Sequence, residues 1–456
     1  MSALKRSERI AHLRALRSLA SVQPLFTIER SVAAIDALGA AEASRFIHTL
    51  RMRTLVSRRL GDLPSPNNAV RDCQAALATK VTSLAHMHTV LQANLDQLER
   101  VARDTGLAIV VGKGLVAHTR YPDRSIRDFN DLDLFVGNHT DAFRLAAVLR
   151  GEFGYTFQNN ELPWLKVDPS DGMVYGQIAH VAPPGAGDML NIDIHFGDYS
   201  VRHCGRLRIA GSLTRDTPGL HLLAPEDNLA CVVNNAAGDY FVTAKDTNDL
   251  LLGITAPGFD LPRFLGLIRQ ARLDGFLGFM IRTLRETTVL TEEQERRFRE
   301  IPLALTVEPP PRPDAPSWTL RCLGTTLHAF AVRRDAGVIA AGRTAANAFS
   351  YYRKRLQLRA VPGGGRNARA AEWNPWTCVR LVPLKMATGL LEQPGEAAYT
   401  NPASSFIGGD KEFERFDTAA GMYFRVGDEF FVGTVEYDLS ADVIRQARAA
   451  AAVRTQ

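Results

Sequence analysis

The sequence predicts an α+β protein in which a small mixed sheet with helices forms a core, helical additions precede and follow it, and a small β-rich unit lies near the C-terminus. Short apolar runs typical of strands occur between residues 107 and 196, and again among the aromatic residues of 421–437. Apolar residues spaced by three or four dominate the stretches between them. The length of 456 residues leaves room for two or three domains of ~150 residues each.

The composition is that of a globular protein, with 46% hydrophobic and 23% charged residues, which excludes a disordered or fibrous chain. A net charge of +5 and a pI near 9.0 allow an anionic partner without requiring one. Five scattered cysteines without a Cys-x-x-Cys pair indicate neither a disulfide framework nor a zinc site. The N-terminus lacks the apolar segment of a signal peptide, and no apolar stretch approaches the ~18 residues of a membrane span. We therefore expect a cytoplasmic protein with no membrane partner.

Residues 1–105 are predicted to form an N-terminal helical region, whose clearest helix runs from Ser83 to Arg103 and stops at Gly106. The core spans 106–222. It is predicted to contain strands over 107–111, 131–136 and 190–196, a turn over 112–114 that leads into a short helix, and a longer helix over 140–150.

The rest of the chain is predicted to be mostly helical up to its last segment. Residues 223–307 form a helical region, and 308–316 form a proline-rich linker. A helical segment and a glycine-rich loop follow over 317–371. The β-rich unit spans 372–456, with a hairpin that turns at Gly427-Asp428.

The stretch from Gly112 to Ala117 matches Gly-x-Gly-x-x-Ala after a strand, which is the outline of a dinucleotide-binding motif. The surroundings argue against that motif. Pro122 leaves room for barely two helical turns, and the acidic residues that follow begin the next strand instead of ending it. Gly114 also stands where the Walker A motif requires Ser or Thr, so neither nucleotide motif is predicted.

Asp131 and Asp133 lie two positions apart on a predicted strand, so both carboxylates should face one side while Leu132 and Leu134 face the core. Paired carboxylates repel unless a cation lies between them. The usual cation is Mg²⁺, whose coordination is completed by the phosphates of the substrate. Asp193, on the strand that we expect beside the first, could complete a set that holds two ions ~3.5–4 Å apart. Taken alone, Asp-x-Asp also fits a solvated strand edge.

The order of these parts resembles the DNA polymerase β-type nucleotidyltransferase superfamily: a glycine turn after a strand, then Asp-x-Asp, then a third aspartate on a later strand. The chain is more narrowly similar to an uncharacterised bacterial family of nucleotidyltransferases over roughly residues 80–255. The motifs that carry this similarity are Lys113-Gly114, Arg127, Asp131-Leu-Asp-Leu-Phe-Val136, Gly154-Tyr155, Asp193-Ile-His195 and Leu223-Ala-Pro-Glu-Asp227.

The resemblance implies roles for eight residues. Asp131 and Asp133 would be metal ligands, and Asp193 would be a third ligand or the base that accepts a proton from the acceptor hydroxyl. Gly112 and Gly114 would let the backbone approach the phosphates. The remaining three residues, Lys113, Arg127 and His195, would bind nucleotide or phosphate.

Simpler readings remain open for the basic residues. Lys113 could be solvated, and Arg127 could pair with Asp128 or Asp131. His195 could instead orient a carboxylate, ligate the metal or be a hydrogen-bonded structural residue. Further along, Asp246 and Asp249 resemble an acidic pair that starts a helix in such families, although helix capping explains them adequately.

The implied activity is a Mg²⁺- or Mn²⁺-dependent transfer of a nucleoside monophosphate from an NTP, with ATP favoured, to a small-molecule or peptide acceptor. Pyrophosphate would be released. One alternative is a toxin-type nucleotidyltransferase acting on tRNA or other RNA, which suits the basic pI. Another is a non-catalytic nucleotide-binding scaffold, against which the three carboxylates argue.

Overall fold

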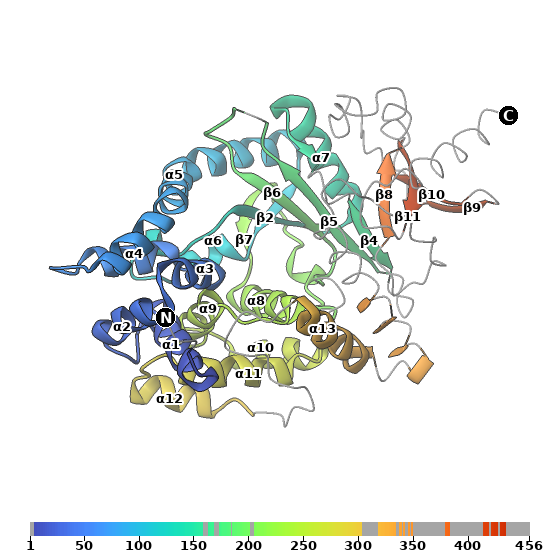
Figure 1. Cartoon of the computed structure of the whole chain (residues 1–456). Coiled ribbons are helices and arrows are strands. Elements are labelled where there is room, and N and C mark those ends of the chain that lie inside the picture. The colour runs from blue at the N-terminus through green and yellow to red at the C-terminus, as the bar shows by residue number, and fades with distance from the viewer. Residues whose placement is uncertain are drawn as a thin grey trace.

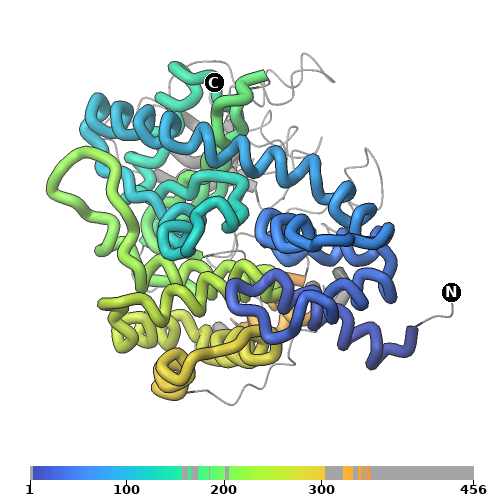
Figure 2. The backbone as a smooth tube through the Cα atoms, turned by 90° about the vertical axis from the view of Figure 1, so that its left-hand side faces the viewer, coloured from blue at the N-terminus to red at the C-terminus, as the bar shows by residue number. Residues whose placement is uncertain are grey.

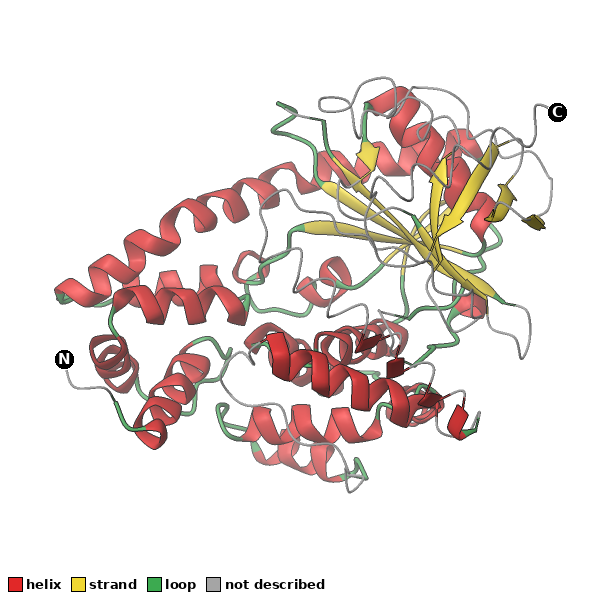
Figure 3. Cartoon of the chain, turned by 45° about the vertical axis from the view of Figure 1, so that its right-hand side comes forward, coloured by secondary structure: helices red, strands yellow, loops and turns green. Residues whose placement is uncertain are grey.

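The computed structural model describes most of residues 4–302 and parts of the chain beyond them. The described ranges are 4–157, 163–167, 173–183, 185–200, 205–302, 318–333, 337–339, 341–342, 345–346, 348–349 and four strands between 379 and 434. They form a mixed α/β structure whose strands gather at one side and whose helices pack beside and below them (Figure 3). The mixed sheet and flanking helices expected from the sequence are thereby confirmed.

The N-terminal region is helical, as predicted (Figure 2). The long last helix starts well before the predicted Ser83, because the Asn67 side chain caps it by accepting a hydrogen bond from the Val70 N–H at 2.9 Å. Gly106 ends it in the left-handed conformation with φ 69°. The five helices are α1 (Arg6–Leu19), α2 (Ile28–Leu38), α3 (Ala40–Leu50), α4 (Arg53–Gly61) and α5 (Asn68–Thr105).

The sheet has the order β7-β1-β2-β6-β5-β4, with β3 paired to β5 and the C-terminal strands continuing past β4 as β8-β11-β10-β9 (Figure 1). Predicted strands account for β1, β2 and β6, whereas β3, β4, β5 and β7 were not predicted. The bounds are β1 (Ala108–Val111), β2 (Asp131–Val136), β3 (Thr156–Phe157), β4 (Trp164–Val167), β5 (Val174–Val181), β6 (Asn191–Phe196) and β7 (Gly219–Leu222).

The connection between β1 and β2 explains why the glycine motif is not a dinucleotide site. It holds only the five-residue helix α6 (Gly114–His118) and the short 3₁₀ turn η1 (Arg124–Ile126), and β1 and β2 are antiparallel. A dinucleotide-binding unit needs parallel strands joined by a full crossover helix. By contrast, β2 and β6 are parallel, and their connection includes helix α7 (His139–Phe153).

The two faces of the central strands serve different purposes. Leu132 and Leu134 of β2 are buried with Ile192 and Ile194 of β6 in a core that helices α5 and α7 cover, as the alternation predicts. The opposite face of β2 carries the aspartates and then Phe135, which packs in a second core with residues of the next helical layer. The carboxylates therefore belong to the face of the sheet that is turned toward those helices.

That layer follows β7 and confirms the helices predicted from residue 223 to about 300. It consists of α8 (Pro225–Asp239), α9 (Ala244–Ile254), α10 (Leu261–Gln270), α11 (Asp274–Arg285) and α12 (Glu292–Arg299), and α13 (Trp318–Arg333) follows. Pro225 occupies the first turn of α8, where its missing N–H costs nothing. Within the described ranges, no helix is both long and apolar enough to cross a membrane.

The C-terminal strands are β8 (Val379–Pro383), β9 (Glu414–Thr418), β10 (Gly421–Val426) and β11 (Glu429–Thr434). The pair β10 and β11 is antiparallel, as the predicted hairpin requires. The predicted turn at Gly427-Asp428, the linker over 308–316 and the glycine-rich loop over 363–365 lie outside the described residues.

Asp128 fastens the N-terminal helices to the core. Helix α4 begins without a capping side chain of its own at Met52. Asp128 replaces that cap: its carboxylate accepts bonds from the backbone N–H of Arg53 at 2.8 Å and of Thr54 at 3.3 Å, and from both side chains at 2.8 and 3.0 Å. Because the Asp128 side chain is 1% exposed, its loss would leave several buried donors without a partner.

We expect Asp128→Ala to lower the free energy of unfolding by about 3–5 kcal/mol, since it leaves the largely buried Arg53 guanidinium unpaired. Urea unfolding followed by circular dichroism measures this change. The matched control is Glu293→Ala, which removes an exposed partner of Arg296 and should change the free energy by about 1 kcal/mol or less. Equal effects of the two substitutions would contradict the anchoring role.

Candidate functional site

The parallel pairing of β2 with β6 places Asp133 directly opposite Asp193. His195 follows two positions along β6, on the same face. One ligand atom from each of these three residues lies within 4.8 Å of the others, which makes them a group able to hold a metal ion. Asp131 pairs with Asn191 at the start of the strands and lies outside this group. The expectation that Asp193 would lie beside the acidic pair on a neighbouring strand is confirmed for Asp133, whereas Asp131 does not converge with the other two.

Lys113 points its ammonium group at this cluster. Its Nζ lies 2.5 Å from Asp133 Oδ1 and 5.1 Å from the centre of the Tyr199 ring. Burial opposes the charge on the ammonium, but the Asp133 carboxylate outweighs it and raises the pKa of Lys113 well above its usual range. The solvated alternative for Lys113 is wrong, because only 16% of its side chain is exposed.

The glycines on either side of Lys113 are needed for close packing. A Cβ at Gly112 would lie 2.5 Å from the Phe135 ring. A Cβ at Gly114 would lie 3.1 Å from the guanidinium of Arg127. The N–H of Gly112 donates to the backbone carbonyl of Asp133 at 2.9 Å, so the turn is fixed directly beside the carboxylates. A side chain at Gly112 would therefore force the Phe135 ring to move, and one at Gly114 would press tightly against Arg127.

His195 and Gln177 hold the two facing carboxylates. The Nε2 of His195 lies 3.2 Å from Asp133 Oδ1, and the amide of Gln177, on β5, donates to Asp193 Oδ2 at 2.8 Å. Burial and the nearby Lys113 lower the pKa of His195 to about 4, so its imidazole is neutral at pH 7. Against the cost of burial, Lys113 and His195 lower the pKa of Asp133 to about 2. Asp133 is therefore a carboxylate at neutral pH.

Asp131 has a different electrostatic environment. Burial and the neighbouring Asp133 carboxylate raise the pKa of Asp131 to about 6, and this rise is opposed by Lys113, Arg51 and Lys245. Arg51 ends helix α3 in the left-handed conformation, and Lys245 lies in the first turn of α9. Basic residues from three separate parts of the chain thus act on this one carboxylate.

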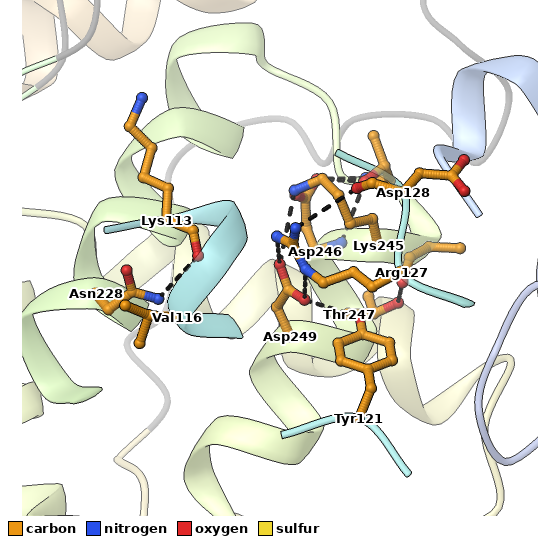
Figure 4. Close-up of polar contacts among 12 residues, drawn as sticks. Lys113, Val116, Tyr121, Arg127, Asp128, Asn228, Lys245, Asp246, Thr247 and Asp249 are labelled. Atoms are coloured by element: carbon orange, nitrogen blue, oxygen red, sulfur yellow. Dashed lines mark hydrogen bonds and ion pairs between the residues drawn. The ribbon is translucent and has the colours of Figure 1, made fainter. Parts of the chain in front are cut away.

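Arg127 does not point toward the metal-binding group. Its Nε and Nη2 donate to the two carboxylate oxygens of Asp249, on helix α9, at 2.9 and 2.7 Å. Tyr121 donates its hydroxyl to Asp249 as well, at 2.8 Å. Figure 4 shows this buried cluster, with the Lys113 side chain pointing away from it. Arg127 thus forms a structural ion pair, as the simpler reading expected, but its carboxylate partner is Asp249 and not Asp128 or Asp131. Its bond to Asp128 is to the backbone carbonyl, at 3.5 Å.

The adjacent aspartates of α9 have separate roles. Asp246 completes a capping box with Thr243, as the capping interpretation predicted. Asp249 lies in the next turn, where it binds Arg127, so capping does not account for it. Sequence reasoning missed this pairing because the two residues belong to elements that meet only in the folded chain.

Gln177, Tyr199 and Lys245 were also missed. Gln177 lies on a strand that was not predicted, since Gly176 interrupts its apolar pattern. That glycine is required because a Cβ there would lie 2.0 Å from the backbone carbonyl of Trp164. The position of Lys245 in the sequence could have identified it, because a lysine in the first turn of a helix is unfavourable with the helix dipole and needs nearby acidic groups. Lys245 finds them in Asp246 at 2.7 Å and Asp249 at 3.7 Å.

A sequence model of the family described as uncharacterised nucleotidyltransferases matches residues 37–288, which is more than half of the chain. The chain belongs to this nucleotidyltransferase family. The matched region extends beyond the range of roughly 80–255 that carried the resemblance, and it takes in helices on both sides of the sheet. No curated protein and no solved structure matches the chain.

We expect the Arg127–Asp249 pair to stabilise the fold of this member of the family. Asp249→Asn leaves a buried arginine without its counter-charge and should lower the free energy of unfolding by about 3–5 kcal/mol. The double variant Arg127→Met with Asp249→Leu removes both charges and should recover much of that loss. Urea unfolding measures both changes.

The control for this comparison is Glu295→Gln, which removes a partly exposed partner of Arg285 and should cost about 1 kcal/mol or less. Unchanged stability of Asp249→Asn would contradict a structural role for the pair.

Proposed function

We propose that the chain is a metal-dependent nucleotidyltransferase that moves a nucleoside monophosphate from an NTP, with ATP favoured, to a small-molecule or peptide acceptor and releases pyrophosphate. The observation that carries this proposal is the meeting of Asp133, Asp193 and His195 on two parallel strands beside the Gly112–Gly114 turn. Membership of the nucleotidyltransferase family supports the reaction class.

The donor set fits Mg²⁺ or Mn²⁺. Carboxylate oxygens are the protein ligands that these ions prefer, and a neutral imidazole is acceptable to Mn²⁺. Asp133 and Asp193 would hold one ion with His195. Asp131 lies outside that group and would serve as a ligand of the second ion of a two-ion site. A bound ion supplies charge neutralisation for the triphosphate and makes the acceptor hydroxyl more acidic.

The chain's own residues would position the substrate and move the proton. The turn from Gly112 to Gly114 presents its backbone to the triphosphate, and Lys113 neutralises a phosphate oxygen. Asp193 accepts the proton of the acceptor group, and the Gln177 amide fixes the orientation of that carboxylate. Arg127 contributes by packing against Gly114, so it supports the turn without contacting phosphate.

We expect Asp133→Asn and Asp193→Asn each to reduce NTP-dependent pyrophosphate release by about 10²- to 10³-fold or more. Each removes a carboxylate that would hold the metal ion, and that ion would supply the positive charge that stabilises the transferring phosphoryl group. The assay is incubation of the full chain with each NTP, Mg²⁺ and pools of candidate acceptors. Asp216→Asn, an exposed aspartate of the same region, should leave turnover unchanged. Full turnover in both carboxylate variants would contradict the mechanism.

Removal of divalent cations should abolish turnover, since three carboxylates on one face cannot approach a triphosphate without them. Treatment with EDTA followed by gel filtration should give an inactive protein, and added Mg²⁺ or Mn²⁺ should restore activity while Ca²⁺ or K⁺ should not. Turnover that persists in EDTA would show that the reaction does not depend on a metal.

The acceptor pools distinguish the alternatives. If labelled nucleotide enters only tRNA, the RNA-modifying activity replaces the proposal of a small acceptor. If NTP binds but no pool yields pyrophosphate, the protein is a nucleotide-binding scaffold.

A further inference from the structure

The side chain of Lys113 lies where a bound cation would be needed. Its ammonium contacts Asp133 Oδ1 at 2.5 Å, and His195 approaches the same oxygen at 3.2 Å. That carboxylate also belongs to the group whose ligand atoms lie within 4.8 Å of one another. We propose that Lys113 is the built-in counter-ion of this site: its ammonium neutralises Asp133 in the metal-free protein and leaves when a divalent cation and the triphosphate bind.

The charges of the site require such a counter-ion. Asp133 is 7% exposed and faces Asp193, so the two carboxylates would repel strongly if no cation were near. The Lys113 ammonium lies closer to Asp133 Oδ1, at 2.5 Å, than the Nε2 of His195 does, at 3.2 Å. Lys113 therefore carries the positive charge that allows these carboxylates to lie together.

An ammonium and a divalent cation compete for this position. A metal ligand oxygen lies about 2.1 Å from Mg²⁺, so the Lys113 ammonium cannot stay at its present distance from Asp133 Oδ1 without strong repulsion. The long, flexible side chain of lysine can move to another anion, and the triphosphate is the one that arrives with the metal.

The backbone of Lys113 fixes the point from which the side chain moves. Lys113 has φ 42° and ψ −108°, a conformation that residues with a side chain rarely adopt. Its carbonyl accepts bonds from the Asn228 side chain at 3.3 Å and from the Ala117 N–H at 3.0 Å. These two bonds hold the backbone of the turn, and Figure 4 shows the one from Asn228. The side chain extends from this fixed backbone to Asp133.

The inference rests on the proposed metal site. It also predicts the direction in which the metal affinity changes when the Lys113 charge is removed, which a lysine that only binds phosphate would not do. A competitor that occupies the site lowers the apparent affinity for the metal by the fraction of time that the site is free. Removing the Lys113 ammonium should therefore strengthen metal binding when no nucleotide is present. It should weaken nucleotide binding when the metal is present.

The test is titration of the full chain with Mn²⁺ alone, followed by the electron paramagnetic resonance signal of the free ion. Lys113→Met should bind Mn²⁺ about tenfold more tightly than the unsubstituted protein, and Lys113→Arg, which keeps the charge, should bind within about twofold of it. Thermal unfolding gives a second readout: Mn²⁺ should raise the Tm of Lys113→Met by more than it raises that of the unsubstituted protein.

Lys113→Gln, which keeps a hydrogen-bond donor but no charge, replaces Lys113→Met if the latter does not fold, and it should shift the Mn²⁺ affinity in the same direction. Equal or weaker Mn²⁺ binding in the uncharged variant overturns the inference. Failure of every variant to bind Mn²⁺ overturns it together with the metal site. If the Mn²⁺ affinity changes as expected but the NTP assay yields no pyrophosphate, the proposed reaction is refuted and the counter-ion role of Lys113 stands.

Discussion

The in-register parallel pairing of β2 with β6 is the constraint on which the rest of the site depends. It sets Asp133 opposite Asp193 and keeps His195 on the same face. Side chains alternate between the faces of a strand, so a shift by one residue would turn Asp193 to the other face and place an isoleucine opposite Asp133. The apolar residues between the acids prevent that shift, because they are buried beneath α5 and α7. The core therefore determines the geometry of the polar site.

Facing carboxylates cost free energy, and the groups that reduce this cost come from separate elements. Lys113 comes from the turn after β1, His195 from β6 and Gln177 from β5. The family match from residue 37 to 288 includes all of them. It also includes the buried pairs that join the sheet to its helices, Arg53 with Asp128 and Arg127 with Asp249. The matched unit thus contains both the site and the contacts that hold its surroundings in place.

Local patterns were sufficient to predict the strands that carry the acids. Residues 131–136 alternate between polar and apolar, and β2 has those bounds. We also expected the strand of Asp193 beside the strand of the acidic pair, but the pattern did not show which of the two aspartates Asp193 would face, because that depends on the register. The pattern did not predict β5, because Gly176, which close packing demands, interrupts the apolar run. Gln177 and its bond to Asp193 were therefore invisible in the sequence.

Lys113 and Arg127 show why the partners of charged residues are harder to predict than strands. Both are basic residues that precede the acidic pair, and both resemble phosphate ligands in the sequence. Arg127 instead binds an aspartate on α9, and its planar guanidinium suits that two-oxygen contact. Lys113 is aimed at Asp133 by a turn that no helix or strand pattern specifies. A basic residue reaches whichever acid the fold brings near it, so its partner follows from the packing of the helices on the sheet and not from its position in the chain.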